Sequence, residues 1–138
     1  NAPTISSELI DNGIEALIND PEADSAVTVS MLNMYSPLRA RKLNSKGYLD
    51  PFVPFEAFGD PATLSCDRDS QGDVFFADMS HSISRSRALD DIANGLLPQQ
   101  WMGKKIIPVY QTYGCDIDAE WQVEASKWWL TENGLNKS

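Results

Sequence analysis

The first hydrophobic pattern along the chain is that of an amphipathic helix. After a group of N-cap candidates, apolar residues recur at helical spacing: Leu9, Ile10, Ile14, Leu17 and Ile18. The pattern ends at Pro21. Two further helices are predicted over residues 84–97 and 119–131. In the last helix Trp121, Trp128 and Trp129 recur along one side, and we expect them to be core and interface anchors rather than a ligand site.

Short β-branched and apolar runs predict three strands among these helices. They cover residues 26–29, 74–77 and 105–110, and Pro108 in the last run indicates an edge strand or a bulge. A hairpin is predicted around Gly47, because a polar, glycine-containing stretch there separates two short runs. Helices interleaved with short strands in 138 residues predict a single α/β or α+β domain.

One long stretch, residues 49–71, shows no clear period. It is rich in proline and contains Phe52, Phe55 and Phe58. A loop of this length in a compact domain is more often functional than idle, so we expect an arm or lid here. Exposed aromatic clusters usually mark an interaction surface, and the commonest closed assembly is a homodimer, which is the oligomer we expect.

Composition narrows the range of partners. The net charge is −9 and the sequence pI is near 4.4, which argues against nucleic acid and against an anionic membrane surface, because both require a basic footprint. No apolar run approaches the roughly 20 residues of a membrane span, and we recognise no signal peptide. Cys66 and Cys115 lack Cys-x-x-Cys spacing, so we expect two reduced thiols in a cytoplasmic protein.

The tripeptide Asp116-Ile117-Asp118, directly before the last predicted helix, carries the strongest chemical signal. In an extended segment, side chains at i and i+2 point to the same side, so the two carboxylates are placed to hold one Mg²⁺ ion beside substrate phosphates. The alternative is that Asp118 only caps the helix by accepting a backbone N–H. The local sequence favours capping, and the rest of the chain shifts the balance toward a metal site.

Four motifs follow one another along the chain: Ser6-Ser7-Glu8-Leu9-Ile10-Asp11, Ser36-Pro37-Leu38-Arg39, Gly72-Asp73-Val74-Phe75-Phe76 and the Asp-Ile-Asp tail. Their order resembles that in the cytidylyltransferases, which activate acidic sugars such as sialic acid-type sugars and Kdo as CMP conjugates. The resemblance covers most of the chain. It implies a three-layer α/β sandwich with a mixed sheet, of the nucleotide-diphospho-sugar transferase type.

The resemblance further implies that residues 1–138 are the C-terminal, sugar-binding and dimerisation part of such an enzyme. Family members begin with a strand and a basic, glycine-containing loop that holds the triphosphate of CTP, and no such loop occurs in this sequence. We therefore expect no catalysis by this chain alone. The alternative function is a binding or assembly module derived from the same fold, without chemistry.

Roles for individual residues also come from the resemblance. Asp116 and Asp118 would hold Mg²⁺ against the phosphates of CTP. The acidic sugar would be bound by Arg39, Arg68, Gln71, Gly72 and Trp101. Arg39 lies where the family has a basic residue that reaches across a dimer, and a guanidinium suits a carboxylate because its fork can bind both oxygens. The alternative for Arg39 is a solvated charge on a strand.

Two other patterns have simpler interpretations. Residues 67–78 match the start of an EF-hand loop, but position 12 is Asp78 rather than Glu and no entering helix precedes them. We therefore predict a polar turn before a strand. His81 follows a predicted strand and has neither a second His nor triad spacing, so an exposed loop residue is predicted.

Overall fold

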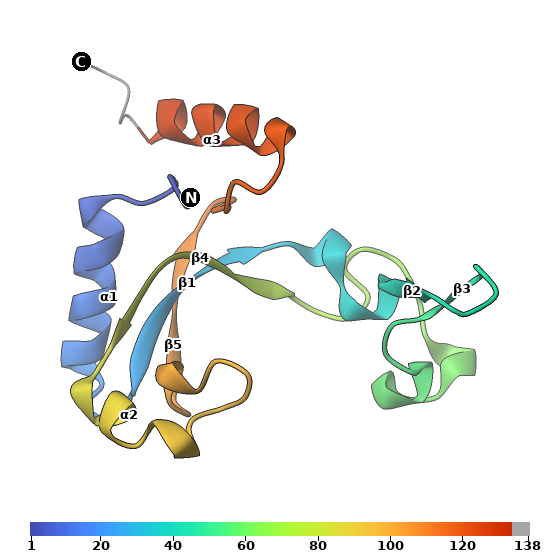
Figure 1. The fold of residues 1–138 in the computed structure, drawn as a ribbon, viewed down its shortest axis with the longest axis horizontal. Coiled ribbons are helices and arrows are strands. Elements are labelled where there is room, and N and C mark those ends of the chain that lie inside the picture. Colours follow the sequence, from blue (N-terminus) through green and yellow to red (C-terminus); the bar gives the residue numbers. More distant parts are fainter. Residues whose placement is uncertain (134–138) are drawn as a thin grey trace. The chain divides into compact units, whose positions relative to one another are not determined.

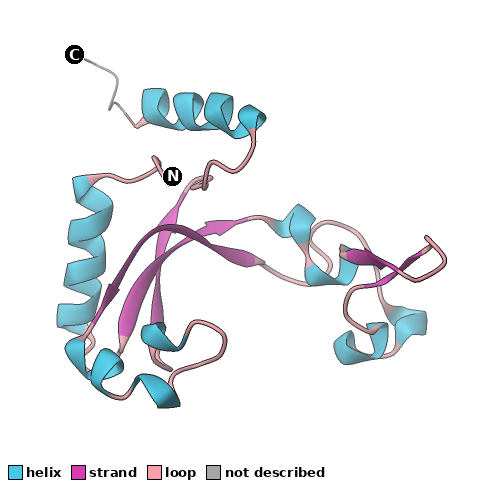
Figure 2. Cartoon of the chain, viewed as in Figure 1, coloured by secondary structure: helices cyan, strands magenta, loops and turns pink. Residues whose placement is uncertain are grey.

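A computed structural model describes residues 1–133 and shows a mixed α/β fold (Figure 1). The chain divides into two compact units: unit 1 comprises Asn1–Ser30 and Ala77–Ser138, and unit 2 comprises Met31–Phe76. Unit 1 holds the α-helices and a three-stranded sheet, whereas unit 2 consists of loops, short 3-10 turns and one hairpin (Figure 2). The prediction of an α/β protein with a mixed sheet is confirmed at this level.

Helix α1 spans Ser7–Asn19, close to the limits that its apolar period predicts. The Ser6 side chain accepts a hydrogen bond from Leu9 N–H at 3.2 Å, an N-cap interaction that contributes about 0.5–2 kcal/mol. Of the predicted apolar stripe, only the line through Leu9, Gly13 and Leu17 is buried. The neighbouring line remains exposed: Ile10, Ile14 and Ile18.

The sheet of unit 1 has the strand order β4-β1-β5. The central strand β1 (Ser25–Met31) runs parallel to β5 (Ile106–Gln111), and Ser30 stands opposite Gln111 near their carboxyl ends. Strand β5 is therefore an edge strand among the described residues, as Pro108 predicts, because an edge strand tolerates a residue without an N–H donor.

Strand β4 (Phe75–Ser84) borders β1 on the other side and is longer than the predicted run. The two strands are antiparallel, since backbone hydrogen bonds flank them at both ends, from Leu32 to Val74 and from Arg85 to Asp24. Between these ends the Thr28 hydroxyl bonds both backbone groups of His81, the N–H at 3.1 Å and the C=O at 3.0 Å. A side chain thus helps to join the two strands.

The core of unit 1 gathers side chains from α1, β1, β5 and α3 (Glu120–Glu132): Leu9, Leu17, Ala23, Ala26, Val109 and Trp129. Trp129 is 1% exposed, but Trp121 and Trp128 are 62% and 50% exposed. The prediction of core and interface anchors is confirmed for the core by Trp129, whereas Trp121 and Trp128 lie on the surface, where the interface role stays a prediction. They stand roughly 80–100° away from Trp129 around the helix, because each residue turns the helix by about 100°.

The long helix predicted over residues 84–97 is wrong. Strand β4 continues through Ser84, α2 covers only Ser86–Asp90, and a single 3-10 turn follows over Ile92–Asn94. Of the apolar side chains in this stretch only Ala88 is buried, and Leu97 is 81% exposed. Most helical stability in proteins comes from packing an amphipathic face, so this segment lacks what a longer helix requires.

Unit 2 contains the hairpin predicted around Gly47. Strand β2 (Arg41–Leu43) pairs antiparallel with β3 (Leu49–Pro51). In the turn between them, the Asn44 side-chain oxygen accepts two backbone N–H groups at 3.0 Å each. Gly47 adopts φ 81°, a left-handed conformation that glycine takes without steric cost.

The segment predicted as an arm, residues 49–71, lies wholly within unit 2. Phe52 is 60% exposed, whereas Phe55 is half-buried with the Arg41 guanidinium 5.0 Å from its ring centroid. Beyond β3 the segment holds two short 3-10 turns, over Phe55–Phe58 and Pro61–Thr63. In the whole described range, 1–133, no helix has the length and apolarity needed to cross a bilayer.

Candidate functional site

The Asp-Ile-Asp tripeptide lies in the loop between β5 and α3, whose residues 114–119 we call the Asp loop. This loop follows the carboxyl end of β5, which is parallel to the central strand β1. In open α/β sheets, ligands bind at the carboxyl ends of the parallel strands. Figure 1 shows that the N-terminus of the chain lies at the same end of the sheet.

Two buried hydroxyl groups hold the first half of the Asp loop. Gly114 N–H donates a hydrogen bond to the Ser30 hydroxyl at 2.8 Å. Cys115 N–H donates to the Thr4 hydroxyl at 3.0 Å. Ser30 and Thr4 are fully buried, so water does not compete for these hydrogen bonds.

The second half of the Asp loop is held as well. Ile117 N–H donates to the Asn1 C=O at 2.8 Å, and the Gln122 side-chain oxygen accepts the N–H groups of Asp118, at 2.7 Å, and of Ala119. Ala119 is the N-cap residue of α3 and has no side-chain acceptor. The interpretation in which Asp118 caps this helix is therefore wrong, because Gln122 reaches back from the first turn instead.

Behind the loop lies a hydrogen-bonded group of side chains, which we call the Asp78 network: the buried Thr4, Ser30, Asp78 and Ser80, and the half-buried Gln111. The Asp78 carboxylate accepts hydrogen bonds from the Ser30 hydroxyl and Gln111 Nε2, both at 2.9 Å, and from Ser80 N–H at 3.1 Å. Gln111 Nε2 also donates to the Ser80 hydroxyl, which lies 2.7 Å from the Thr4 hydroxyl. A carboxylate is costly to bury unless it is hydrogen-bonded, and these donors meet that requirement.

Gly114 packs directly against the Asp78 network. A Cβ atom at this position would lie 2.5 Å from Asp78 Oδ2 and 2.2 Å from Gln111 Nε2, closer than any normal contact. Its φ is not in the left-handed region. Glycine is therefore required in the Gly-Cys-Asp-Ile-Asp motif for space and not for backbone conformation.

The two carboxylates of the Asp loop differ in exposure, since Asp116 is half-buried and Asp118 is exposed. They lie on an irregular segment rather than on a strand, so strand alternation does not set their directions. Within residues 1–133 no three His, Cys, Asp or Glu residues are grouped to hold a metal ion. An Mg²⁺ ion bound here would rest on two carboxylates completed by substrate or water oxygens, which is a common coordination for Mg²⁺.

Arg39 belongs to unit 2, where it ends the 3-10 turn Pro37–Arg39. The Ser36 hydroxyl caps this turn by accepting Leu38 N–H at 3.3 Å. The exposed Arg39 guanidinium donates to the Met34 C=O at 3.2 Å. Because a guanidinium has five N–H donors, this bond leaves capacity for a carboxylate or phosphate.

Arg68, Gln71 and Gly72 share one exposed turn of unit 2, which is the polar turn predicted before β4. Arg68 forms an ion pair with the adjacent Asp69 at 2.8 Å. Gln71 donates to the Ser65 C=O at 3.4 Å, and Gly72 has φ 76°. The structure thus brings these three sequence-predicted residues together on one turn, while Arg39 is carried by a 3-10 turn of the same unit.

Trp101 belongs to unit 1 but lies at the other end of β5 from the Asp loop. It is half-buried in the 3-10 turn Gln100–Met102, which precedes the strand, whereas the Asp loop follows it. The 6 residues of β5 span about 20 Å at roughly 3.3 Å per residue. The structure therefore does not bring Trp101 to Asp116 and Asp118.

His81 is not the exposed loop residue that the sequence predicts. It lies in β4, and both of its ring nitrogens are buried without a hydrogen bond of regular geometry. Burial lowers the pKa of His81, and the negative charge of Asp78 and the backbone of Leu9 offset this only in part. The ring faces α1, since a Cβ at Gly13 would lie 3.3 Å from His81 Nε2.

Sequence reasoning missed the residues that hold the Asp loop. Ser30 ends a β-branched strand, and Asp78 stands inside an apolar run that continues from Phe75 and Phe76. A polar residue inside such a run was a usable signal, because a buried polar side chain needs a specific partner. The identity of those partners was not readable, since they come from distant segments.

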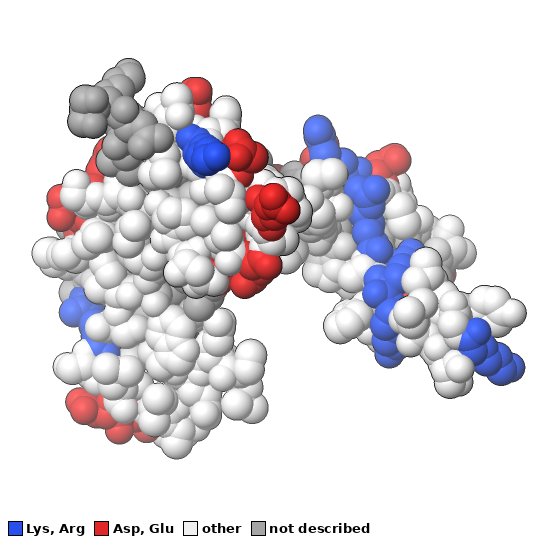
Figure 3. Space-filling model, turned by 45° about the horizontal axis from the view of Figure 1, so that its top comes forward, with Lys and Arg blue, Asp and Glu red and all other residues white. Residues whose placement is uncertain are grey.

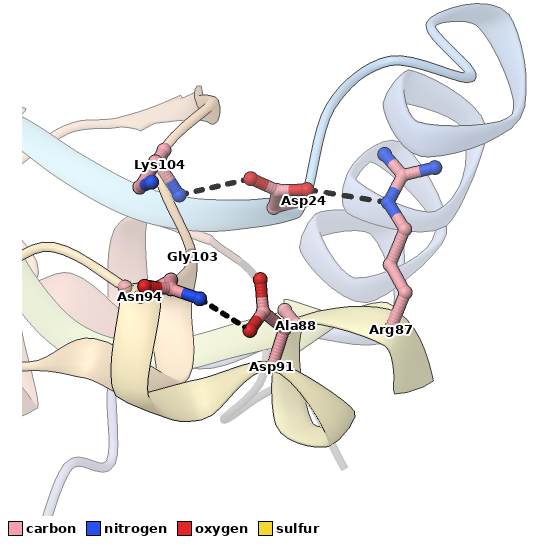
Figure 4. Close-up of a pocket in the computed structure, with 8 residues that line it drawn as sticks. Asp24, Arg87, Ala88, Asp91, Asn94, Gly103 and Lys104 are labelled. Carbon is pink, nitrogen blue, oxygen red and sulfur yellow. Dashed lines mark hydrogen bonds and ion pairs between the residues drawn. The ribbon is translucent and has the colours of Figure 1, made fainter.

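A polar hollow of about 220 Å³ lies where β1 and β5 begin (Figure 4). Asp24 accepts hydrogen bonds from the N–H groups of Lys104 at 2.9 Å and Lys105 at 3.0 Å, and it pairs with Arg87 Nε at 3.2 Å. The backbone hydrogen bonds from Lys104 and Lys105 hold the pKa of the Asp24 carboxyl below its usual value. Figure 4 shows Asp24 between Lys104 and Arg87.

The remaining groups around this hollow also have partners within the protein. The Asp91 carboxylate accepts a hydrogen bond from Asn94 at 2.6 Å (Figure 4). The Arg87 guanidinium donates to the C=O groups of Pro21 at 2.8 Å and Ala23 at 2.6 Å. We interpret the hollow as a structural corner that joins α1, β1 and β5, at the sheet end opposite the Asp loop.

A scan against models of known protein families finds no match for this chain, and a search of curated proteins finds no matching protein.

Proposed function

We propose that this chain is the sugar-binding and dimerisation part of a cytidylyltransferase-type enzyme, which transfers CMP from CTP to an acidic sugar. The observation that supports this most is the Asp loop, which presents Asp116 and Asp118 at the carboxyl end of a parallel strand and directly before a helix. Such strand ends are where α/β folds bind nucleotides. The proposed complete fold is the three-layer nucleotide-diphospho-sugar transferase type.

In the proposed reaction, the anomeric hydroxyl of the acidic sugar attacks the α-phosphate of CTP. The new bond joins the anomeric oxygen to that phosphorus, the bond to the β-phosphate breaks, pyrophosphate leaves and a proton is released. An Mg²⁺ ion held by Asp116 and Asp118 would neutralise charge on the phosphate oxygens. The hydrogen-bonded N–H groups of the Asp loop already have acceptors in the protein, so the loop contributes carboxylates rather than backbone donors.

The proposed sugar-binding residues are Arg39, Arg68, Gln71, Gly72 and Trp101. The guanidinium groups of Arg39 and Arg68 match the carboxylate of an acidic sugar. Both are exposed, and so is the Gln71 amide, which can donate and accept hydrogen bonds to hydroxyl groups. The proposed compartment is the cytoplasm, in keeping with Cys66 and Cys115, which are both free thiols without a disulfide bond.

We also propose a homodimer in which unit 2 of one copy meets the Asp-loop end of a second copy. Exposed apolar side chains of unit 2 support this: Leu43, Tyr48, Leu49 and Phe52. Lys and Arg side chains form a row along unit 2 on the face shown in Figure 3. Their charge is complementary to the acidic stretch formed by the Asp loop and the start of α3: Asp116, Asp118, Glu120 and Glu124. In such a dimer Arg39 would act on the partner's site.

The metal assignment is tested with Mn²⁺ as a paramagnetic probe for Mg²⁺. Addition of Mn²⁺ to the chain should broaden the amide resonances around Asp116 and Asp118. Loss of even an outer-shell partner costs about 10–100-fold in metal affinity, so Asp116→Asn and Asp118→Asn should each weaken binding by more than about tenfold. Asp90→Asn, which removes an exposed carboxylate from α2 near the other end of the sheet, is the matched control and should bind like the wild type.

The same titration separates the enzyme proposal from the binding module. If Asp116→Asn binds Mn²⁺ as tightly as the wild-type chain, the metal assignment is wrong and the module without chemistry is favoured. Both Asn variants preserve side-chain size, so their urea midpoints should remain close to that of the wild type. A large loss of stability in Asp118→Asn would contradict the finding that Gln122, and not Asp118, serves the helix start.

A further inference from the structure

The Ser30 hydroxyl connects the Asp loop to a buried charge. It donates its single hydrogen to Asp78 Oδ2 at 2.9 Å and accepts Gly114 N–H at 2.8 Å. Because the hydrogen is committed to the carboxylate, the oxygen lone pairs are turned toward the incoming N–H. The direction of the Gly114 N–H is thus set by where Asp78 lies.

Asp78, which lies on β4, is in turn fixed by one residue of β5 and one residue of its own strand. Its Oδ2 accepts Gln111 Nε2 at the end of β5, three residues before Gly114, and its other oxygen accepts Ser80 N–H on β4 itself. A carboxylate that accepts a hydroxyl hydrogen polarises that hydroxyl, which strengthens it as an acceptor for the next N–H in the series. The ends of β1 and β5 and the first residue of the Asp loop therefore share one buried negative charge.

We propose that Ser30 and Asp78 are positioning residues: their buried hydroxyl–carboxylate pair fixes Gly114 and thereby sets where the Asp loop holds Asp116. Only Cys115 separates Gly114 from Asp116, so a shift of the Gly114 peptide is passed along two residues of backbone. The consequence for metal binding rests on the proposed function, whereas the positioning of the loop does not. Neither residue touches the substrate in this proposal.

Ser30→Ala tests the proposal, and Ser25→Ala provides a matched control. Both serines lie on β1 and are buried, but the Ser25 hydroxyl donates to the Met102 C=O at 2.7 Å, at the opposite end of the strand. Ser30→Ala removes two hydrogen bonds, one of them to a carboxylate, and Ser25→Ala removes one, so Ser30→Ala should lower the urea midpoint more, and exchange is therefore compared with that of the α1 amides in the same variant. Only Ser30→Ala should accelerate hydrogen exchange at Gly114 and Cys115, by about fivefold relative to the amides of α1, the effect of one typical hydrogen bond.

A second variant, Asp78→Asn, keeps the size of the side chain and removes its charge. It should accelerate exchange at Gly114 in the same way, so the proposal does not depend on one substitution. Exchange at Gly114 that is unchanged in both variants, or equally accelerated in Ser25→Ala, would overturn the positioning role.

Titration with Mn²⁺ then distinguishes this proposal from the proposed function. If Ser30→Ala weakens Mn²⁺ binding by about threefold or more while Ser25→Ala does not, the positioned loop is the metal site, because a displaced ligand lowers affinity as a lost outer-shell partner does. If Ser30→Ala accelerates exchange but the wild-type chain binds no Mn²⁺, the positioning role stands and the metal assignment falls.

Discussion

Substitution of Asp24 should weaken the corner where β1 and β5 begin. Asp24→Ala removes the acceptor of two backbone N–H groups, those of Lys104 and Lys105, and the partner of Arg87. A hydrogen bond to a charged group contributes about 1.5–3 kcal/mol. The lower value applies to each backbone hydrogen bond of Asp24, because the Asp24 side chain is 21% exposed. The pair with half-exposed Arg87 adds at most about 1 kcal/mol. We expect a loss of roughly 3 kcal/mol in the free energy of unfolding.

Asp24→Asn is the matched comparison. In the wild type a single oxygen, Oδ2, accepts both backbone N–H groups, and the side-chain oxygen of Asn can do the same. This variant therefore loses the charge and the pair with Arg87 but keeps the two backbone hydrogen bonds. Its expected cost is about 2 kcal/mol, because the two hydrogen bonds become neutral and the ion pair is lost, so it should unfold at a higher urea concentration than Asp24→Ala at pH 7. A loss below about 0.5 kcal/mol in Asp24→Ala would refute the structural role, because surface substitutions without such a role fall in that range.

The pH dependence gives an independent check on Asp24. Hydrogen bonds from Lys104 and Lys105 lower the pKa of this carboxyl in the folded protein. Its contribution to stability is therefore present above its unfolded pKa of about 3.9 and is lost as the pH falls through the lower folded value. The stability difference between the wild type and Asp24→Asn should be constant from pH 7 to about pH 5 and shrink below pH 4.

Two further predictions concern His81 and the dimer. Burial lowers the pKa of His81 below its unfolded value of about 6.5, so the contribution of the neutral His81 to stability is fully present above that pH and is lost as the pH falls through the lower folded pKa. His81→Phe should therefore flatten the decline in urea midpoint between pH 7 and pH 5. An unchanged slope would contradict the burial argument. Light scattering at tens of micromolar should give the mass of a dimer for the wild-type chain. Phe52→Asp should give a monomer, and the control Leu97→Asp, in unit 1, should remain a dimer. A monomeric wild-type chain would contradict the proposed dimer.

The elements that sequence predicted well are those whose signals are local. Helix α1 follows from an apolar period and a Ser cap, and the hairpin follows from a polar turn that contains Gly47. Pro108 identified an edge strand, because it lacks the donor that an interior strand requires. In each case the signal is carried by a few neighbouring residues and can be recognised without knowing the tertiary contacts.

Predictions failed where burial decides the outcome. Residues 84–97 have the composition of a helix, but their first residue belongs to β4, and the large apolar side chains that follow stay exposed: Leu89, Ile92, Leu96 and Leu97. His81 looked like a loop residue because the β4 run is broken by polar residues, yet the strand continues and α1 covers the ring. Tertiary contacts override local preference in both segments.

The candidate site shows the same division. The two carboxylates were visible in the sequence as a motif, whereas the residues that hold their loop were not. Asn1 accepts a hydrogen bond from Ile117 N–H, and Thr4 accepts one from Cys115 N–H. More than a hundred residues of sequence separate the partners, so no local pattern predicts these hydrogen bonds. Gly114 is the exception, because a glycine before a functional motif can be suspected of allowing close backbone approach, which is what its contact with Asp78 requires.

The way the Asp loop is held bears on how it can act. The N–H groups of Gly114, Cys115 and Ile117 have three acceptors from two segments, one at the end of β1 and two near the N-terminus. A loop fixed at so many points loses little further conformational freedom when a ligand binds, and this preorganisation favours affinity. The same arrangement makes the loop sensitive to substitutions in distant segments. Changes at Thr4 or Ser30 should therefore act on Asp116 through the backbone, although neither side chain belongs to the motif itself.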